Sequence, residues 1–425
     1  MTKTLSILLF VASCTGAHRE LASDAGIDAP PACGGEVCDD PPEAACIDGD
    51  TLRSYEATCE ADTCSYPETE VECGALGCCD DHCCAVSPSS SVELGGLVSN
   101  GLEVEVLDGT FDTSTECTEG ASLGSCSVVA RATLGEACVC RADKIRIGNL
   151  RVTGTRALVL FAHREVLVTG TLDLSAQKNV DGPGASYVTP PDPGGAPGGS
   201  YGSRGGASGA VQSSGVAGMQ TLSPLAGGMR GADGGGLGGG GGGAIQITAG
   251  FRVDLVGTID VGGGGGRARG AMQPDLRGGG GGSGGAILLE APTVIVGGRL
   301  LANGGGGGGG SGGGSNGTDG WDAAMVRTQN VPITEPPRGG SPGHYTCPNW
   351  YVTHASAGGA GATGMNMAQP GGGNISTYCS GAGPYLLGSG GGGGGVGRIR
   401  INTTNECQCT GVVLPAATFG TVITR

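Results

Sequence analysis

The sequence has almost no lysine: after Lys3 it contains only Lys144 and Lys178. Acidic residues outnumber lysine and arginine by 39 to 23, and the formal net charge is −16. The chain therefore lacks the basic face that nucleic-acid binding requires, and this class of partner is excluded. Long apolar runs are also missing beyond the first residues, so no later segment is predicted to cross a bilayer as a helix.

The motifs of common hydrolases and nucleotide-binding enzymes are missing as well. The five histidines are dispersed, and no HExxH sequence is present. Matches to GxGxxG and GxSxG, the latter around Ser283, fall within glycine tracts and lack the strand and helix that give these motifs meaning. No cofactor and no metal ion is therefore expected, and no convincing set of catalytic residues is found.

The first residues have the pattern of an export signal. Lys3 precedes an apolar run, residues 5–12, which is too short to span a bilayer. The run ends in VASC, and small residues before a cysteine resemble the lipobox of bacterial lipoproteins. The resemblance implies a signal peptide at residues 1–13, lipidation of Cys14, and, because Thr15 is not aspartate, the outer membrane. The alternative is an ordinary secretory peptide in which Cys14 is incidental.

Cysteine is abundant: the chain has 19, and without Cys14 an even number remains for pairing. Such a content is typical of an oxidising compartment. Residues 14–32 are rich in small and polar residues and are predicted to form a lipid-anchored flexible tether. In residues 33–84, disulfides are expected to replace a hydrophobic core. The cysteines of this module are Cys33, Cys38, Cys46, Cys59, Cys64, Cys73, Cys78, Cys79, Cys83 and Cys84.

Residues 46–84 resemble small Cys-rich modules in predicted surface proteins of myxobacteria-like species. The resemblance implies no known chemistry. The sequence CCDDHCC at its end could also form a zinc site with His82. Disulfides are favoured, because an exported chain meets oxidants before it meets free zinc.

The remaining cysteines lie in pairs separated by one residue. Cys138 and Cys140 share one strand face, so they are expected to bond to Cys117 and Cys126 and not to each other. By the same reasoning, Cys407 and Cys409 are expected to bond to Cys347 and Cys379.

A repeat of about twenty residues appears from residue 137 once glycine-rich inserts are set aside. Apolar residues alternate in three short bursts within each copy, which predicts strands with one buried face. Strands this short bury that face only by stacking on the next copy. The copies begin at Ala137, Ala157, Ala244 and Ala286, with a partial copy at Gly397.

The repeat resembles glycine-rich β-solenoids of bacterial surface proteins. It predicts an all-β fold, a short right-handed parallel β-helix over residues 137–425, after a connecting segment at 85–136. Single glycines between the bursts are expected at corners that need positive φ. They are Gly154, Gly170, Gly257 and Gly298.

Three long inserts, residues 177–243, 264–285 and 303–395, are expected to leave from one corner of this coil. In one interpretation they are mobile closed loops, and shortening one costs little free energy. In the other, the glycine tracts form extended left-handed helices that pack side by side, as in glycine-rich domains of some receptors.

The best candidate for chemistry is a pair of aspartates. GTLDL and GTIDV place Asp173 and Asp260 outward at the same register of adjacent copies. Such a pair could bind calcium or share a proton, as in many β-helix polysaccharide lyases and hydrolases, with Asp254 as a further acid. The competing interpretation is a solvated face screened by Arg299, because no basic residue aligns as a proton acceptor.

Together these patterns predict a lipid-anchored, non-catalytic structural or adhesive protein of the outer membrane or cell surface. Its expected partners are the membrane, through the lipid, and surface glycans or other cells. The alternative is a carbohydrate-active β-helix enzyme that uses the outward aspartates. No pattern in the sequence predicts an oligomeric state.

Overall fold

The structure is a computed structural model, and the chain divides into two compact units: Met1–Cys73 with Cys78–His82, and Gly74–Gly77 with Cys83–Arg425. The described residues are 32–33, 36–38, 40–48, 51–61, 63–73, 78–79, 82–83, 86–89, 101–131, 134–186, 196–268, 277–311, 315–328, 332–346, 352–364, 366–373, 375–379 and 383–424.

Disulfides and short antiparallel strands build the Cys-rich module. Disulfides join Cys38 to Cys64 and Cys46 to Cys78, and Cys59, Cys73, Cys79 and Cys83 are also disulfide-bonded. The zinc interpretation of CCDDHCC is therefore wrong for the described cysteines, because oxidised sulfurs are not thiolate ligands. The strands are β1 (Ala32–Cys33), β2 (Glu36–Val37), β3 (Ala45–Cys46), β4 (Thr51–Tyr55), β5 (Thr58–Glu60), β6 (Thr63–Ser65), β7 (Glu68–Glu72), β8 (Cys78–Cys79) and β9 (His82–Cys83).

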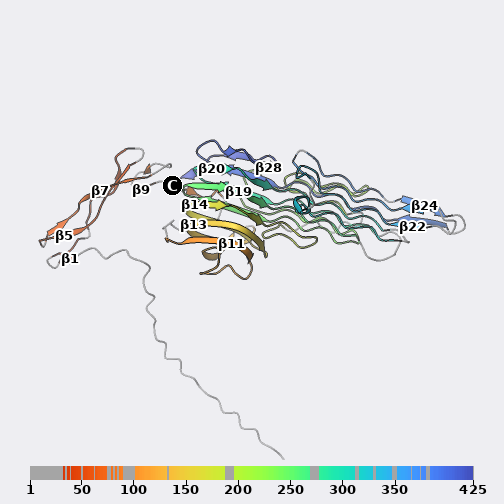
Figure 1. Cartoon of the computed structure of the whole chain (residues 1–425), viewed down its shortest axis with the longest axis horizontal. Helices are drawn as coiled ribbons and strands as arrows, with labels where there is room; N and C mark the ends of the chain where they lie inside the picture. The colour runs from red at the N-terminus through yellow and green to blue at the C-terminus, as the bar shows by residue number, and fades with distance from the viewer. Residues whose placement is uncertain are drawn as a thin grey trace, which may run out of the picture. The chain divides into compact units, whose positions relative to one another are not determined.

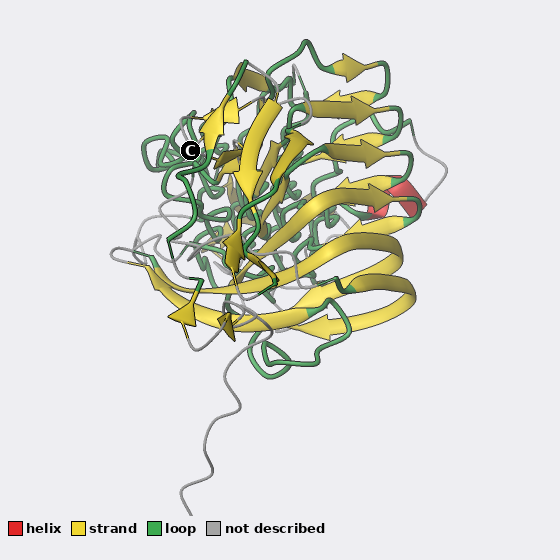
Figure 2. Cartoon of the chain, turned by 90° about the vertical axis from the view of Figure 1, so that its left-hand side faces the viewer, coloured by secondary structure: helices red, strands yellow, loops and turns green. Residues whose placement is uncertain are grey.

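A curled, mostly parallel sheet forms the base of the second unit, and Figure 2 shows its bent strands stacked one above another. Three ladders follow one another around the curl: β13–β14–β16–β19–β26–β29, β13–β14–β17–β20–β27, and β13–β15–β18–β21–β28. The strands are β13 (Gly135–Thr153), β14 (Ala157–Val168), β15 (Thr171–Asp173), β16 (Ala244–Ala249), β17 (Arg252–Leu255), β18 (Thr258–Asp260), β19 (Ala286–Glu290), β20 (Thr293–Val296), β21 (Arg299–Leu301), β26 (Arg398–Asn402), β27 (Gln408–Cys409), β28 (Val412–Leu414) and β29 (Thr418–Gly420).

The register of these ladders is the one that the repeat predicts. Leu160 pairs with Ile247, and Ile247 pairs with Leu289 in the next copy. The second and third bursts align in the same way, for example Val166 with Val253. These side chains are fully buried in one continuous core, because alternation places every second residue on the inner face.

Two further strands of this sheet come from the segment expected only to connect the two parts. β11 (Glu103–Asp112) runs parallel to β13, and β12 (Ser125–Arg131) runs antiparallel to it. Near the C-terminus, β30 (Ile423–Thr424) pairs with β10 (Val86–Ser87). The sheet therefore begins before the first recognisable copy of the repeat.

Corner glycines stack on one another, and most of them do so for a reason other than the expected one. Gly154 adopts a φ of 100°, as predicted. Gly170, Gly257 and Gly298 do not have positive φ; a Cβ on any of them would overlap the backbone of the glycine one copy earlier. These positions require glycine because the chains approach closely, so the prediction of positive φ is wrong there.

All three inserts leave the sheet after the third-ladder strands β15, β18 and β21 and return at β16, β19 and β26, as predicted. In Figure 1 the inserts run side by side away from the sheet. The hairpins β22–β23 and β24–β25, which belong to the third insert, lie at the far end. The elements within the third insert are α1 (Met325–Thr328), β22 (His344–Thr346), β23 (Val352–His354), β24 (Ile375–Cys379) and β25 (Gly383–Leu387). None of the helical structure among the described residues reaches the length and apolar character needed to span a bilayer.

Backbone hydrogen bonds join the inserts with a period of three residues. In the tract 278–285, every third amide donates to the same neighbouring segment, and three different segments receive these bonds in turn. The first set runs from Gly278, Gly281 and Gly284 to the carbonyls of Ser389, Gly392 and Gly395; the second from Gly279, Gly282 and Gly285 to Arg267, Gly264 and Val261; the third from Gly280 and Ser283 to Ala232 and Met229. Three residues per turn without internal hydrogen bonds is the geometry of a polyproline II chain.

The inserts thus form a packed bundle, which we call the glycine lattice: residues 196–243, 261–268, 277–285, 302–311 and 387–397 as far as they are described. Its tract glycines are buried, and a Cβ at most of them would overlap a neighbouring carbonyl. The expectation of mobile closed loops is therefore wrong, because each tract provides the hydrogen-bond partners of the next. The second interpretation, extended helices packed side by side, agrees with the structure.

Candidate functional site

The aspartate pair lies in the third ladder, as the repeat predicts. Asp173 of β15 and Asp260 of β18 are direct register partners. Asp254 is not part of this pair, because it lies on β17 between Leu167 and Ile295 in the second ladder. The structure therefore brings together two of the three acids that the sequence nominated.

Two arginines that the sequence analysis missed neutralise the pair. Arg151, on the preceding strand β13, lies 2.8 Å from a carboxylate oxygen of Asp173. Arg327 of α1 contacts both acids, with its Nη2 at 3.1 Å from Asp173 and its Nε at 3.7 Å from Asp260. Arg299 aligns with Thr258 as the repeat predicts, but its side chain is exposed and, among the described residues, it forms no ion pair with either acid. The ion pairs of the two acids thus come from other residues of the described chain, and the expectation for Arg299 is wrong.

The glycine lattice positions Arg327 over the acids. The carboxylate of Asp322, just before α1, accepts hydrogen bonds from the amides of Lys178 at 2.8 Å and Gly265 at 2.7 Å. The amide of Ala323 donates to Gly263 at 2.9 Å. These bonds tie the third insert to the first two, so no spacing within the repeat could have predicted this contact.

The two carboxyls have opposite pKa shifts. Burial raises the pKa of Asp260 to about 6 even though Arg327 opposes the shift. Burial also acts on Asp173, but Arg151, Arg327 and hydrogen bonds from Ser175 outweigh it and hold the Asp173 pKa below its usual value. A carboxyl that keeps its proton beside one that loses it is typical of acid–base sites. Here, however, Asp260 is 2% exposed and an arginine occupies the approach to both acids.

We expect Asp260→Asn to stabilise the protein at pH 8. Because the pKa of Asp260 rises from 3.8 to about 6 on folding, the folded state binds more protons than the unfolded state between these values, and stability falls as pH rises through this window. Well above pH 6, asparagine removes an ionisation penalty on the order of 3 kcal/mol, a figure that already includes the favourable Arg327 contact because the pKa of about 6 does. Urea unfolding at pH 4 and pH 8 measures the difference, which should be small at pH 4. A variant less stable than the parent at pH 8 would mean that the Arg327 pairing outweighs burial.

A second buried acid lies on the outer side of the first ladder. Glu290 is fully buried, and its carboxylate accepts hydrogen bonds from Gln246 at 2.7 Å, Thr248 at 3.0 Å and Asn402 at 2.9 Å. The amide of Ser89 also donates to it, at 3.2 Å. These donors satisfy the carboxylate, so the network holds residues 86–89 on the sheet and offers no open ligand position.

The cysteines of the sheet follow one prediction and contradict the other. Cys117 bonds to Cys138 and Cys126 bonds to Cys140, which confirms the expected pairing. The sulfurs of Cys126, Cys138 and Cys140 lie within 4.8 Å of one another, but all three are oxidised and are not metal ligands.

Cys407 and Cys409 bond to each other, so the prediction that they reach Cys347 and Cys379 is wrong. The two Cα atoms are 5.2 Å apart, which is shorter than two fully extended residues span, so the backbone bends at Gln408 and lets the two side chains meet. Cys14, Cys84 and Cys347 lie outside the described residues.

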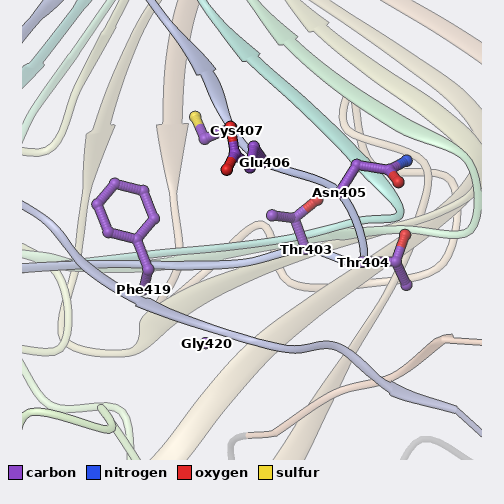
Figure 3. A pocket seen from close by; sticks show the side chains of 7 residues that line it. All are labelled: Thr403, Thr404, Asn405, Glu406, Cys407, Phe419 and Gly420. Atoms are coloured by element: carbon purple, nitrogen blue, oxygen red, sulfur yellow. The ribbon is translucent and has the colours of Figure 1, made fainter.

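A pocket of about 450 Å³ opens beside this disulfide. Figure 3 shows that its side chains come from two segments near the C-terminal end of the sheet, residues 403–407 and 419–420. Phe419 is 59% exposed, and Cys407 forms part of the wall, whereas Cys409 does not. The sequence analysis missed this site, because its two segments alternate weakly and lie after the last glycine tract.

Comparison with known proteins adds no relative: no family model, no curated protein and no solved structure matches this chain.

Proposed function

We propose that this chain is a non-catalytic surface scaffold, structural or adhesive, attached to the outer membrane or cell surface by a lipid on Cys14. The glycine lattice carries the proposal. It contains glycine tracts from all three inserts, and its buried hydrogen bonds make it an ordered extension of the sheet. Ordered packing of the inserts makes the protein longer and stiffer, which suits a scaffold that presents a binding surface.

We also propose that the curled sheet is a short right-handed parallel β-helix. The support is the repeated order of the three ladders and the stacked corner glycines, which give each copy the same path. Strand-to-strand stacking of this kind is how a solenoid buries a core that no single copy could form.

The ends of the third insert are the proposed display surface. The hairpins β22–β23 and β24–β25 lie at the end of the lattice away from the sheet (Figure 1). His344 is tied to the insert by Ser315, whose hydroxyl lies 2.7 Å from the His344 Nδ1. Hairpins held on an ordered support can present contacts to surface glycans or other cells, the partners that we propose.

The alternative is a carbohydrate-active enzyme that uses Asp173 and Asp260. The opposite pKa shifts of the two carboxyls favour it. The arginine contacts and the burial of Asp260 argue against it, since a sugar would have to displace Arg327. Incubating the purified chain with plant and bacterial polysaccharides, alongside a glycan array, separates the two: release of soluble products favours the enzyme, and binding without release favours the scaffold.

Cys14→Ser is expected to move the protein from the membrane pellet to the soluble fraction of its host, because one acylated cysteine is the proposed apolar attachment. Mass spectrometry of the mature N-terminus provides the second readout. Unchanged pelleting of the variant, with no lipid on the N-terminus of the parent protein, would contradict the anchor.

A further inference from the structure

The disulfide between Cys407 and Cys409 closes a much shorter loop than the disulfides Cys38–Cys64, Cys46–Cys78, Cys117–Cys138 and Cys126–Cys140. It spans a sequence separation of 2, whereas the others span 14 to 32. Cross-links that close a short loop constrain the unfolded chain least. Breaking this bond therefore costs the fold less than breaking any of the longer ones.

Accessibility also distinguishes this bond. Cys126, Cys138 and Cys140 are 1% exposed or less, while Cys407 and Cys409 are half-buried at the edge of the core. A thiolate must reach a sulfur in line to open a disulfide, so accessible bonds are the ones that exchange. In the sheet, Cys407–Cys409 is the bond that meets this requirement among the described pairs.

We propose that Cys407–Cys409 is a thiol–disulfide exchange site for cysteine-containing peptides, and that the adjoining pocket binds the residue next to the reacting cysteine. Cys407 is among the residues that line this pocket and Cys409 is not, so we take the Cys407 sulfur, which Figure 3 places at the edge of the lining side chains, as the one that an incoming thiolate attacks. The exposed ring of Phe419 offers an apolar contact in the same pocket, which selects an apolar neighbour of the substrate cysteine.

The edge of the sheet provides a place for the peptide backbone. Among the described strands, β27 has one partner, β20. Its other edge can accept an extended peptide as an added strand, as sheet edges commonly do. An added strand beside Gln408 would bring a peptide cysteine close to the bond.

The exchange is balanced without another reagent. The peptide thiolate attacks the Cys407 sulfur, a mixed disulfide forms, and the Cys409 sulfur leaves as a thiolate. A second peptide thiolate then attacks the peptide sulfur of the mixed disulfide and releases Cys407. Two peptide thiols are oxidised to one disulfide, and the protein disulfide is reduced to two thiols.

Graded reduction of the full-length, unmodified protein tests the proposal first. With reduced glutathione, followed by alkylation and peptide mass mapping, we expect Cys407 and Cys409 to be labelled at least about tenfold faster than Cys126 and Cys140. Equal or slower labelling of Cys407 and Cys409 would overturn the proposal, and this experiment requires no variant to fold.

Two single variants then assign the reacting sulfur. Cys409→Ser leaves Cys407 as a free thiol in the pocket, and Cys407→Ser leaves Cys409 outside it. With glutathione disulfide as probe, we expect Cys409→Ser to form the mixed disulfide about tenfold faster than Cys407→Ser. Equal rates would refute the role of the pocket.

The preference for an apolar neighbour has its own control. Cysteine peptides with a flanking leucine should react faster than peptides with a flanking serine, and Phe419→Ala should remove the difference. Phe251→Ala, at an exposed phenylalanine on a different part of the sheet, should keep it. A preference that survives Phe419→Ala would rule out this ring as the specificity contact.

Discussion

Gly282→Ala should destabilise the protein by about 3 kcal/mol or more, a large effect for one methyl group. Gly282 lies inside the glycine lattice: its amide donates to Gly264 at 2.9 Å, and its carbonyl accepts from Gly305 at 2.8 Å. A Cβ at this position would overlap the carbonyl group of Gly240. The neighbouring chain would have to move, and the bonds that it makes would be lost. Chemical denaturation of the purified protein measures the change.

Gly215→Ala is the matched control in the first insert. Gly215 is exposed, and no described atom lies within 4 Å of a Cβ added there. Where glycine is not required, alanine is neutral or stabilises by up to about 1 kcal/mol, because it restricts the unfolded chain. If both substitutions were neutral, the tracts would be mobile loops and the lattice would be wrong.

Ile247→Asp is expected to abolish the folded state. Ile247 is fully buried between Leu160 and Leu289 of the adjacent copies. Aspartate there would place an unpaired charge between the buried apolar strands of adjacent copies, at a cost of several kcal/mol. The β-type circular dichroism and the thermal transition should both disappear.

Val256→Asp tests the same substitution where the structure predicts tolerance. Val256 lies at a corner between the second and third ladders and is 63% exposed, so the new carboxylate stays in water. We expect a change within about 0.5 kcal/mol. A folded Ile247→Asp protein, or an unfolded Val256→Asp protein, would contradict the assignment of inner and outer faces.

The sheet could be predicted from the sequence because alternation reports directly on burial. Leu158, Ile245 and Ile287 occupy one ladder for the same reason that they recur in the sequence: each fills the inner face of its copy. Pairing of Cys138 with Cys117 followed from the same rule, since a strand face fixes where a side chain points.

The same alternation rule could not decide whether the glycine tracts are mobile loops or a packed lattice. Glycine has no side chain, so a tract such as residues 304–310 shows no alternation between inner and outer positions. A mobile segment and a packed segment can therefore have the same sequence. The packing is seen only in the backbone hydrogen bonds, where the amides of Gly307 and Gly308 donate to two different segments of the chain. Glycine is needed there to let backbones touch, a requirement that composition alone does not distinguish from flexibility.

The contact between Arg327 and the aspartate pair could not be predicted from the sequence for a related reason. Arg327 reaches Asp173 across a sequence separation of 154, along a path that the lattice fixes. The Cys407–Cys409 disulfide departs from the strand rule because the backbone bends at Gln408 and brings the two Cα atoms to 5.2 Å. In both cases the contact depends on backbone geometry that the alternation of the sequence does not report.

Hydrogen exchange of the backbone amides in the tracts 278–285 and 391–397 tests the glycine lattice most directly. The full-length protein is exchanged in deuterated buffer and compared with β16 as an internal reference for buried sheet. We expect the amides of both tracts to be protected from exchange to the same degree as those of β16, because they donate to buried carbonyls of neighbouring segments. Exchange of both tracts at the rate of an unstructured peptide, with β16 still protected, would contradict the lattice.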